Sequence, residues 1–160
     1  MEKFNSSMQL TRGADYATRV MLYLASLPAH ERVLLPMLAK ATGAPESFLS
    51  KVLQSLTHAQ LIVSRRGQSG GFEILPKGRQ ASMRDVIVAV DGPLYLNVCL
   101  ISEDACAREK WCVAHPVWVK AQQAMLDVLS SAVIGEMGAR TAEPASSADS
   151  SVAELKVLKR

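Results

Sequence analysis

The fold is decided by the stretch LPMLAKATGAPESFLSKVLQSL, residues 35–56. A short helix is predicted for its first eight residues. Pro36 stands in the first turn, where proline is tolerated, and Gly43 suits the left-handed residue just past a helix end. A second helix is predicted from Pro45 onward. Its apolar residues fall on one stripe that is expected to face inward, namely Phe48, Leu49, Val52, Leu53 and Leu56.

Two short β-type runs frame a basic, glycine-rich loop in the next segment, LIVSRRGQSGGFEIL at 61–75. Such runs around glycines predict a β-hairpin, and Arg65 and Arg66 fall near its tip. Two short helices joined by a glycine turn and followed by a hairpin give the element order of a winged helix-turn-helix. The sequence therefore predicts a mostly α-helical fold with a small β-hairpin wing.

In a winged helix-turn-helix the second helix enters the major groove of DNA, which is about 12 Å wide, and its N-terminal residues reach the base edges. At this position the chain has Ser47, Ser50 and Lys51, with Glu46 before them. The two arginines of the hairpin would contact phosphates or enter a minor groove. The alternative is an all-α module whose hairpin binds nothing, because helix pairs with glycine turns occur in many folds.

The charge distribution agrees with a polyanionic partner. Residues 1–80 hold ten Lys or Arg against five Asp or Glu, whereas residues 81–160 hold eight against ten. The net charge of +3 therefore originates in the first half of the chain. A solvated basic face without a partner would give the same count, so the charge supports DNA binding only weakly.

Three further helices are predicted around this segment. The first is capped by Thr11 and ends at Pro28. The second begins after Ser82, which forms a capping box with Asp85. The third is predicted over 116–135 and is expected to pair with a second copy of the chain, because its apolar face is long for the end of a small domain. This face consists of Trp118, Ala121, Met125, Val128 or Leu129, and Val133.

These elements divide the chain into three predicted parts. Residues 8–80 form the winged helix-turn-helix domain, residues 81–138 hold a cysteine loop and the dimerisation helix, and residues 139–160 are expected to be a disordered tail. No apolar run approaches the roughly 20 residues of a membrane helix, and the N-terminus lacks a signal-peptide pattern, so a cytoplasmic location is expected. An enzyme is not expected, because the chain has no nucleophile–base pattern and no phosphate-binding loop.

All three cysteines lie in one segment without periodicity, spaced Cys99-x6-Cys106-x5-Cys112, and His115 follows after two residues. Three thiolates and an imidazole can converge on one soft metal centre, either an iron–sulfur cluster or a zinc ion. The alternative is three small packing residues or oxidant-sensing thiols without metal. Two further classes are possible. A small electron-transfer iron–sulfur protein would leave the basic hairpin and the helix pair without a purpose, and a zinc-stabilised interaction module would use the 116–135 helix.

Three stretches resemble the IscR/NsrR-type family of winged helix-turn-helix bacterial transcription regulators: MQLTRGADYA at 8–17, RGQSGGF at 66–72 and VAVD at 88–91. The likeness extends over about 8–135 in the family's order. It implies a homodimeric, DNA-binding repressor or activator that senses redox state, nitric oxide or iron–sulfur status. The family's groove-reading positions fall on Ser47, Ser50 and Lys51.

The same resemblance implies an iron–sulfur cluster in the cysteine loop, although cluster-binding members usually have five residues, not six, between the first two cysteines. CVAHPVW at 112–118 is similar to the C-x2-H-x2-W of the cluster-assembly regulator, in which the histidine completes a [2Fe–2S] site. Nitric-oxide-sensing relatives instead use an acidic residue from the first helix of the other subunit for a [4Fe–4S] site. The expected ligands are Cys99, Cys106, Cys112 and His115, with Asp15 of the partner subunit as the alternative fourth ligand.

Overall fold

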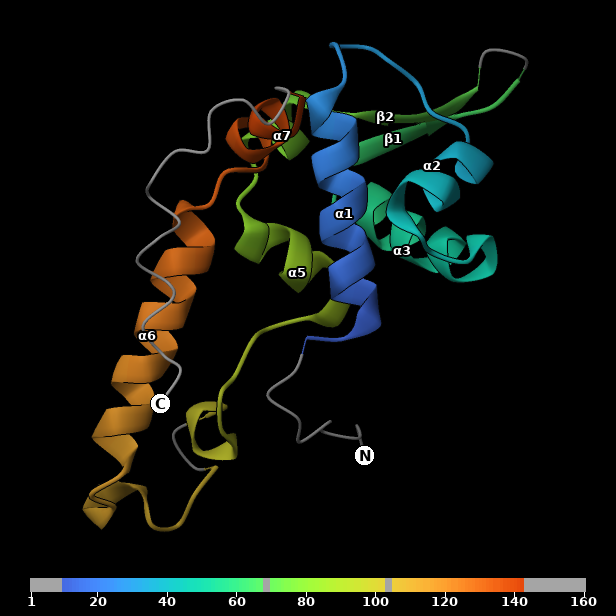
Figure 1. The fold of residues 1–160 in the computed structure, drawn as a ribbon. Helices are drawn as coiled ribbons and strands as arrows, with labels where there is room; N and C mark the ends of the chain where they lie inside the picture. Colours follow the sequence, from blue (N-terminus) through green and yellow to red (C-terminus); the bar gives the residue numbers. More distant parts are fainter. Residues whose placement is uncertain (1–9, 68–69, 103–104, 143–160) are drawn as a thin grey trace.

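The computed structural model describes residues 10–67, 70–102 and 105–142, which are mostly helical with one two-stranded antiparallel sheet (Figure 1). None of the helices within these ranges is long and apolar enough to cross a membrane. The order α2, α3, β1, β2 is the predicted winged helix-turn-helix. The elements are α1 (Arg12–Ser26), α2 (Leu35–Thr42), α3 (Glu46–His58), β1 (Ile62–Arg65), β2 (Gly71–Ile74), α4 (Pro76–Gln80), α5 (Met83–Asp91), η1 (Val98–Leu100), η2 (Glu109–Trp111), α6 (His115–Ser131) and α7 (Ile134–Ala142).

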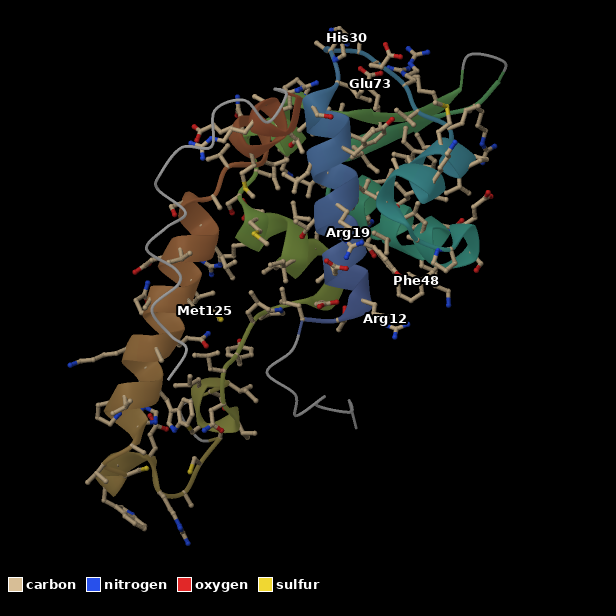
Figure 2. The ribbon with its side chains drawn as sticks, in the orientation of Figure 1. Arg12, Arg19, His30, Phe48, Glu73 and Met125 are labelled. Carbon is tan, nitrogen blue, oxygen red and sulfur yellow. The ribbon has the colours of Figure 1, made fainter. Side chains whose placement is uncertain are left out.

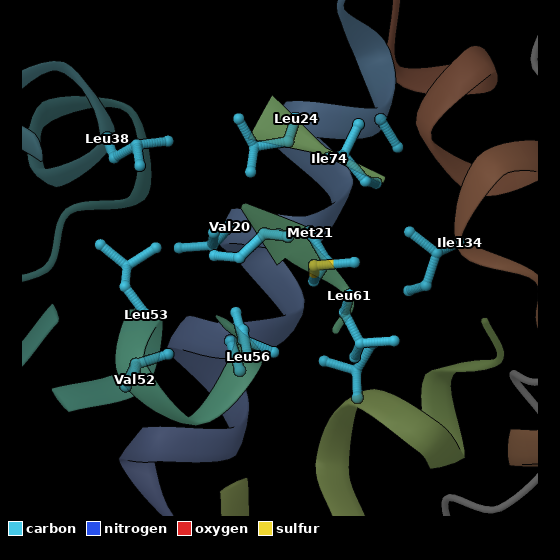
Figure 3. Close-up of a cluster of buried hydrophobic side chains, with 14 of the residues drawn as sticks. Val20, Met21, Leu24, Leu38, Val52, Leu53, Leu56, Leu61, Ile74 and Ile134 are labelled. Atoms are coloured by element: carbon cyan, nitrogen blue, oxygen red, sulfur yellow. The ribbon is translucent and has the colours of Figure 1, made fainter. Parts of the chain in front are cut away.

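Helix α1 forms the centre of the core and packs against α2, α3, α5 and α7 (Figure 1). Thr11 caps it as predicted, since its Oγ1 accepts a hydrogen bond from Ala14 N at 3.2 Å. On its inward face Val20, Met21 and Leu24 are at most 1% exposed. Figure 3 shows these side chains among apolar groups from α2, α3, β2 and α7. The core therefore joins the helix pair, the hairpin and the C-terminal helix into one packed unit.

The helix pair follows the prediction except at one aromatic residue. Helix α2 ends at Gly43, whose φ of +69° lies in the left-handed region that favours glycine. Phe48, which was expected to face inward, is 39% exposed and packs edge-on against Tyr16 with ring centroids 5.6 Å apart. It stands in the first turn of α3, at the margin of the contact with α1. The buried stripe of α3 is Leu49, Val52, Leu53 and Leu56.

The hairpin is tied to the helix pair at its base. Its strands pair in antiparallel register with Ile62 opposite Ile74. Phe72 also exchanges two backbone hydrogen bonds with Val33 of the α1–α2 connection, at 2.9 and 3.0 Å. These bonds extend the hairpin by a third short segment, so the position of the wing relative to α2 is determined by backbone pairing.

The single helix predicted over 116–135 is interrupted between α6 and α7. Backbone pairing with the start of α5 makes the break, because Met83 N donates to the carbonyl of Ala132 at 2.8 Å and Ile134 N donates to the carbonyl of Ala81 at 2.9 Å. Val133 forms an isolated bridge with Ser82 and does not belong to the apolar face of α6, contrary to the prediction. The break depends on partners about 50 residues away in the chain, and local helical periodicity does not register such partners.

Helix α7 packs against α1. Ile134 is fully buried in the core, and Gly138 lies so close to α1 that a Cβ there would be 2.5 Å from the Cβ of Ala25. Residues 139–142 continue this helix, so the tail predicted to begin at 139 is helical in its first four residues. The contact with α1 supports the helix where composition alone indicates disorder. The rest of the predicted tail, 143–160, lies outside the described residues.

Candidate nucleic-acid interface and cysteine loop

The N-terminal half of α3 presents the predicted groove-reading residues on its outer face. Ser47 and Lys51 are exposed and Ser50 is half-buried, whereas Leu49 between them is fully buried in the core. The Ser50 hydroxyl donates to the carbonyl of Glu46 at 3.0 Å, which orients its oxygen while leaving it able to accept a hydrogen bond. Because no side chain caps the start of α3, its first backbone N–H groups can also donate to an external acceptor.

The wing presents two basic side chains. Arg65 is the last residue of β1 and Arg66 follows it, and both are exposed. The predicted tip of the hairpin includes residues 68–69, which lie outside the described residues. Both arginines that were predicted to contact DNA therefore lie in the described part of the wing.

A groove of about 580 Å³ separates α3 from the wing. Most of its lining side chains can form hydrogen bonds, and one of them is the Arg66 guanidinium. The groove also includes Ser50, so one strand of a bound polymer could contact the outer face of α3 and the wing together. The lining residues are Ser50, Leu53, Gln54, Thr57, His58, Ser64, Arg66 and Phe72.

A buried carboxylate at the base of the wing was not predicted. The Glu73 side chain is 9% exposed; its Oε1 lies 2.9 Å from Nδ1 of His30, and its Oε2 accepts a hydrogen bond from Arg32 Nε at 3.3 Å (Figure 2). The hydrogen bond with His30 is the main cause that holds the pKa of Glu73 below its ordinary value; burial opposes this shift and Arg32 adds to it. Glu73 thus binds the α1–α2 connection to β2.

Asp15, the alternative metal ligand, lies on the exposed side of α1 and is paired within its own chain. Its Oδ2 is 2.8 Å from Nη2 of Arg19, one turn later. Arg19 also donates to the carbonyl of Thr42 at 3.3 Å and lies over the ring of Tyr16, 5.8 Å from its centroid. Asp15 therefore helps to orient a guanidinium against the end of α2, next to the turn that precedes α3.

The cysteine loop, the segment between α5 and α6, lies at the end of α6 that is remote from α7 (Figure 1). Three successive backbone hydrogen bonds run through it: Glu109 N donates to Cys106 O at 3.1 Å, Cys112 N to Glu109 O at 3.4 Å, and His115 N to Cys112 O at 3.2 Å. These turns link Cys106, Glu109, Cys112 and His115 along the chain, whereas Cys99 lies in η1.

The chemistry of this loop fits a soft metal centre. All three cysteines are free and half-buried, and Nδ1 of His115 is buried without a hydrogen-bond partner, as is Oε2 of Glu109. In the described part of the chain, however, no three Cys, His, Asp or Glu side chains are gathered closely enough to hold a metal ion. A centre bound by all three cysteines therefore requires the loop to bring these side chains closer together than they lie here.

Helix α6 has an apolar surface that the described part of the chain leaves exposed. It packs against α5 and η1, yet none of its residues is buried. Val117 and Val128 are 65% and 68% exposed, and Trp118, Met125 and Leu129 are half-buried. This surface includes most of the face that was predicted to pair with a second copy.

Comparison with known proteins gives consistent relatives. The model of the Rrf2 family, described as "Iron-dependent Transcriptional regulator", matches residues 10–140. The chain is 38% identical over 87 residues to a provisionally named HTH-type transcriptional regulator of Mycobacterium tuberculosis strain H37Rv. The match covers 54% of this chain and 54% of that protein, so the chain spans about half the length of this relative. The chain is also 25% identical over 130 residues to protein rrf2 of Nitratidesulfovibrio vulgaris, covering 81% of this chain and 87% of that protein.

Two solved structures show the same arrangement of elements. T. potens IscR superposes with a TM-score of 0.68 at 25% identity, covering 88% of this chain and 93% of that one. CymR, the global cysteine regulator of B. subtilis, superposes with a TM-score of 0.67 at 23% identity, covering 84% of this chain and 98% of that one. The likeness to CymR concerns the fold alone.

Proposed function

The chain belongs to the Rrf2 family of transcriptional regulators, and we propose that it binds duplex DNA as a homodimeric transcriptional regulator. One observation carries the proposal: Ser50 of the N-terminal half of α3 and Arg66 of the wing line the same groove. The matched family and its named regulators are not enzymes, which agrees with the proposal.

The groove-reading residues of α3 would act at the base edges. Serine hydroxyls at 47 and 50 can donate or accept, and the Lys51 ammonium can donate to N7 and O6 of guanine. Arg65 and Arg66 would meet phosphates or the adjacent minor groove, while the DNA backbone between the two grooves occupies the space between α3 and the wing. The Glu73 contacts would help to hold the wing in place against the α1–α2 connection.

A dimer through α6 would place two copies of α3 on one DNA face. The exposed apolar surface of α6 supports this pairing, because contiguous apolar surface on a small protein commonly marks an interface. Two recognition helices related by twofold symmetry fit half-sites about 34–36 Å apart. The operator is therefore expected to be a palindrome.

Selection from a random duplex library tests DNA recognition. The wild-type protein should enrich a palindromic sequence, and fluorescence anisotropy should show binding to that duplex about 10³-fold or more tighter than to a scrambled duplex at the same salt concentration. Equal affinity for both duplexes would contradict the proposal, since electrostatic attraction alone does not distinguish sequences.

We further propose that the DNA affinity of the protein depends on an iron–sulfur cluster bound by the three cysteines. The likeness to T. potens IscR and the donor types in the loop support this proposal. A bound cluster would supply a centre that redox state, nitric oxide or iron scarcity can alter. His115 is favoured as the fourth ligand, because its Nδ1 has no partner, whereas Asp15 is paired with Arg19. This choice favours a [2Fe–2S] cluster.

Anaerobic purification followed by absorbance spectroscopy and iron and zinc analysis tests the cofactor. Each single Cys→Ala change should remove most of the visible absorbance, and His115→Ala should abolish or shift it while Asp15→Asn leaves it intact. DNA affinity should differ between cluster-bound and cluster-free protein by about 5- to 150-fold. Zinc without iron would instead indicate a structural metal. Protein without metal would indicate a thiol- or ligand-sensing repressor of the same fold.

A further inference from the structure

Two buried polar atoms in the cysteine loop have no hydrogen-bond partner, Oε2 of Glu109 and Nδ1 of His115. They belong to side chains that face each other, because Oε1 of Glu109 is 3.6 Å from Nε2 of His115. The two side chains are only 27% and 18% exposed. A buried polar atom without a partner is destabilising, so two such atoms in one place indicate that the loop is organised around a group it binds.

We propose that Glu109 is a positioning residue for His115. Its carboxylate accepts the Nε2–H of the imidazole and thereby leaves Nδ1 as the atom that binds the cluster. This inference rests on the proposed function, because it takes His115 as a ligand. A histidine that binds a metal commonly donates its other ring N–H to a carboxylate, and this hydrogen bond fixes which nitrogen binds.

The backbone places Glu109 where this role requires it. Successive backbone turns link Cys106, Glu109, Cys112 and His115, so the carboxylate that faces the imidazole belongs to the same loop as two of the expected thiolate ligands. A shift of a few tenths of an ångström would bring the 3.6 Å separation to hydrogen-bonding distance, whether or not a centre is bound. Of the two basic side chains at this turn, Arg108 lies over the ring of Trp111 at 5.8 Å and Lys110 is exposed.

Glu109 also adds a negative charge beside the centre. A carboxylate hydrogen-bonded to a ligating imidazole makes the ring more basic and disfavours the reduced, more negative state of the centre. Glu109→Gln keeps an oxygen that can accept the Nε2–H but removes the charge, whereas Glu109→Leu removes both. Glu136→Gln is a matched control, because Glu136 is an exposed carboxylate of α7 in a different part of the fold.

The test uses full-length protein reconstituted anaerobically with ferrous iron and sulfide, with histidine labelled by ¹⁵N at the δ1 position only. In pulsed electron paramagnetic resonance of the reduced cluster, wild type should show the strong coupling of a directly bound ¹⁵N. Glu109→Gln should keep that coupling but raise the midpoint potential. In Glu109→Leu either ring nitrogen can bind, so the strong coupling to the labelled Nδ1 should be reduced. Glu136→Gln should match wild type in both the coupling and the midpoint potential.

Metal-free protein gives a second readout that does not depend on the cluster. The Nε2–H proton of His115 should be visible by nuclear magnetic resonance in wild type and Glu109→Gln, and lost to solvent exchange in Glu109→Leu. A strongly coupled Nε2 in wild type, or a Glu109→Leu protein that matches wild type in both readouts, would overturn the inference while the cluster itself stands. If wild type binds no cluster, the proposed cofactor fails, and with it the ligand role of Nδ1.

Discussion

Replacing the buried Ile134 with alanine tests whether α7 folds back onto α1 as the structure shows. Ile134 is fully buried, and comparable truncations in protein cores cost about 2–5 kcal/mol. Because Gly138 already brings α7 into backbone contact with α1, the two helices cannot move closer to fill the cavity. We therefore expect Ile134→Ala to lower the free energy of unfolding by about 3 kcal/mol.

Urea unfolding followed by circular dichroism measures this loss. With an m-value of about 2 kcal/mol per M, the midpoint should fall by about 1.5 M. Met37→Ala is the matched control, because Met37 on α2 is 55% exposed and its truncation should change stability by no more than about 0.5 kcal/mol. Both variants are measured at two protein concentrations, since association stabilises the folded state. Equal midpoints for the two variants would refute the packing of α7 against α1.

Three further outcomes are expected. Folding lowers the pKa of Glu73, so the free energy of unfolding of wild type should exceed that of Glu73→Gln above pH 4.5. This difference should disappear as the pH falls through the pKa of Glu73 in the folded protein. In urea unfolding, a difference that persists unchanged at pH 2 would contradict this. Met125→Glu should yield monomers in sedimentation while the exposed control Gln123→Glu stays dimeric; unchanged dimers would exclude α6 as the interface. Ser47→Ala should alter base preference at particular operator positions in library selection without changing salt dependence, and a uniform loss of affinity would reject its role.

The helix pair, the hairpin and the caps could be predicted from sequence because their signals are local. Gly43 ends α2, and Ser82 and Asp85 form the capping box of α5, from residues within one turn of each boundary. The break between α6 and α7 could not be predicted in this way. No local signal such as a proline marks the break at Ala132. The break follows from backbone hydrogen bonds of Ala132 and Ile134 with Met83 and Ala81, at the start of α5.

The candidate site shows the same division between local and distant information. The exposed face of α3 follows from helical periodicity, since Ser47 and Lys51 lie opposite the apolar stripe. Glu73 was missed because its partners His30 and Arg32 are more than 40 residues away and a strand pattern gives no sign of a buried carboxylate. The spacing of the cysteines indicated metal chemistry, but the position of Glu109 beside His115 depends on the path of the loop.

The salt dependence of DNA binding by the double variant Arg65→Ala/Arg66→Ala tests the central claim most directly. Each phosphate contact contributes about 0.9 to the slope of log K against log salt concentration, so the double variant should have a slope smaller by about 1.8 than wild type on the selected operator. Arg84→Ala/Arg140→Ala, which removes two exposed arginines of α5 and α7, should keep the wild-type slope. A wing variant with the wild-type slope and affinity would contradict the assignment of the wing as a DNA-binding element.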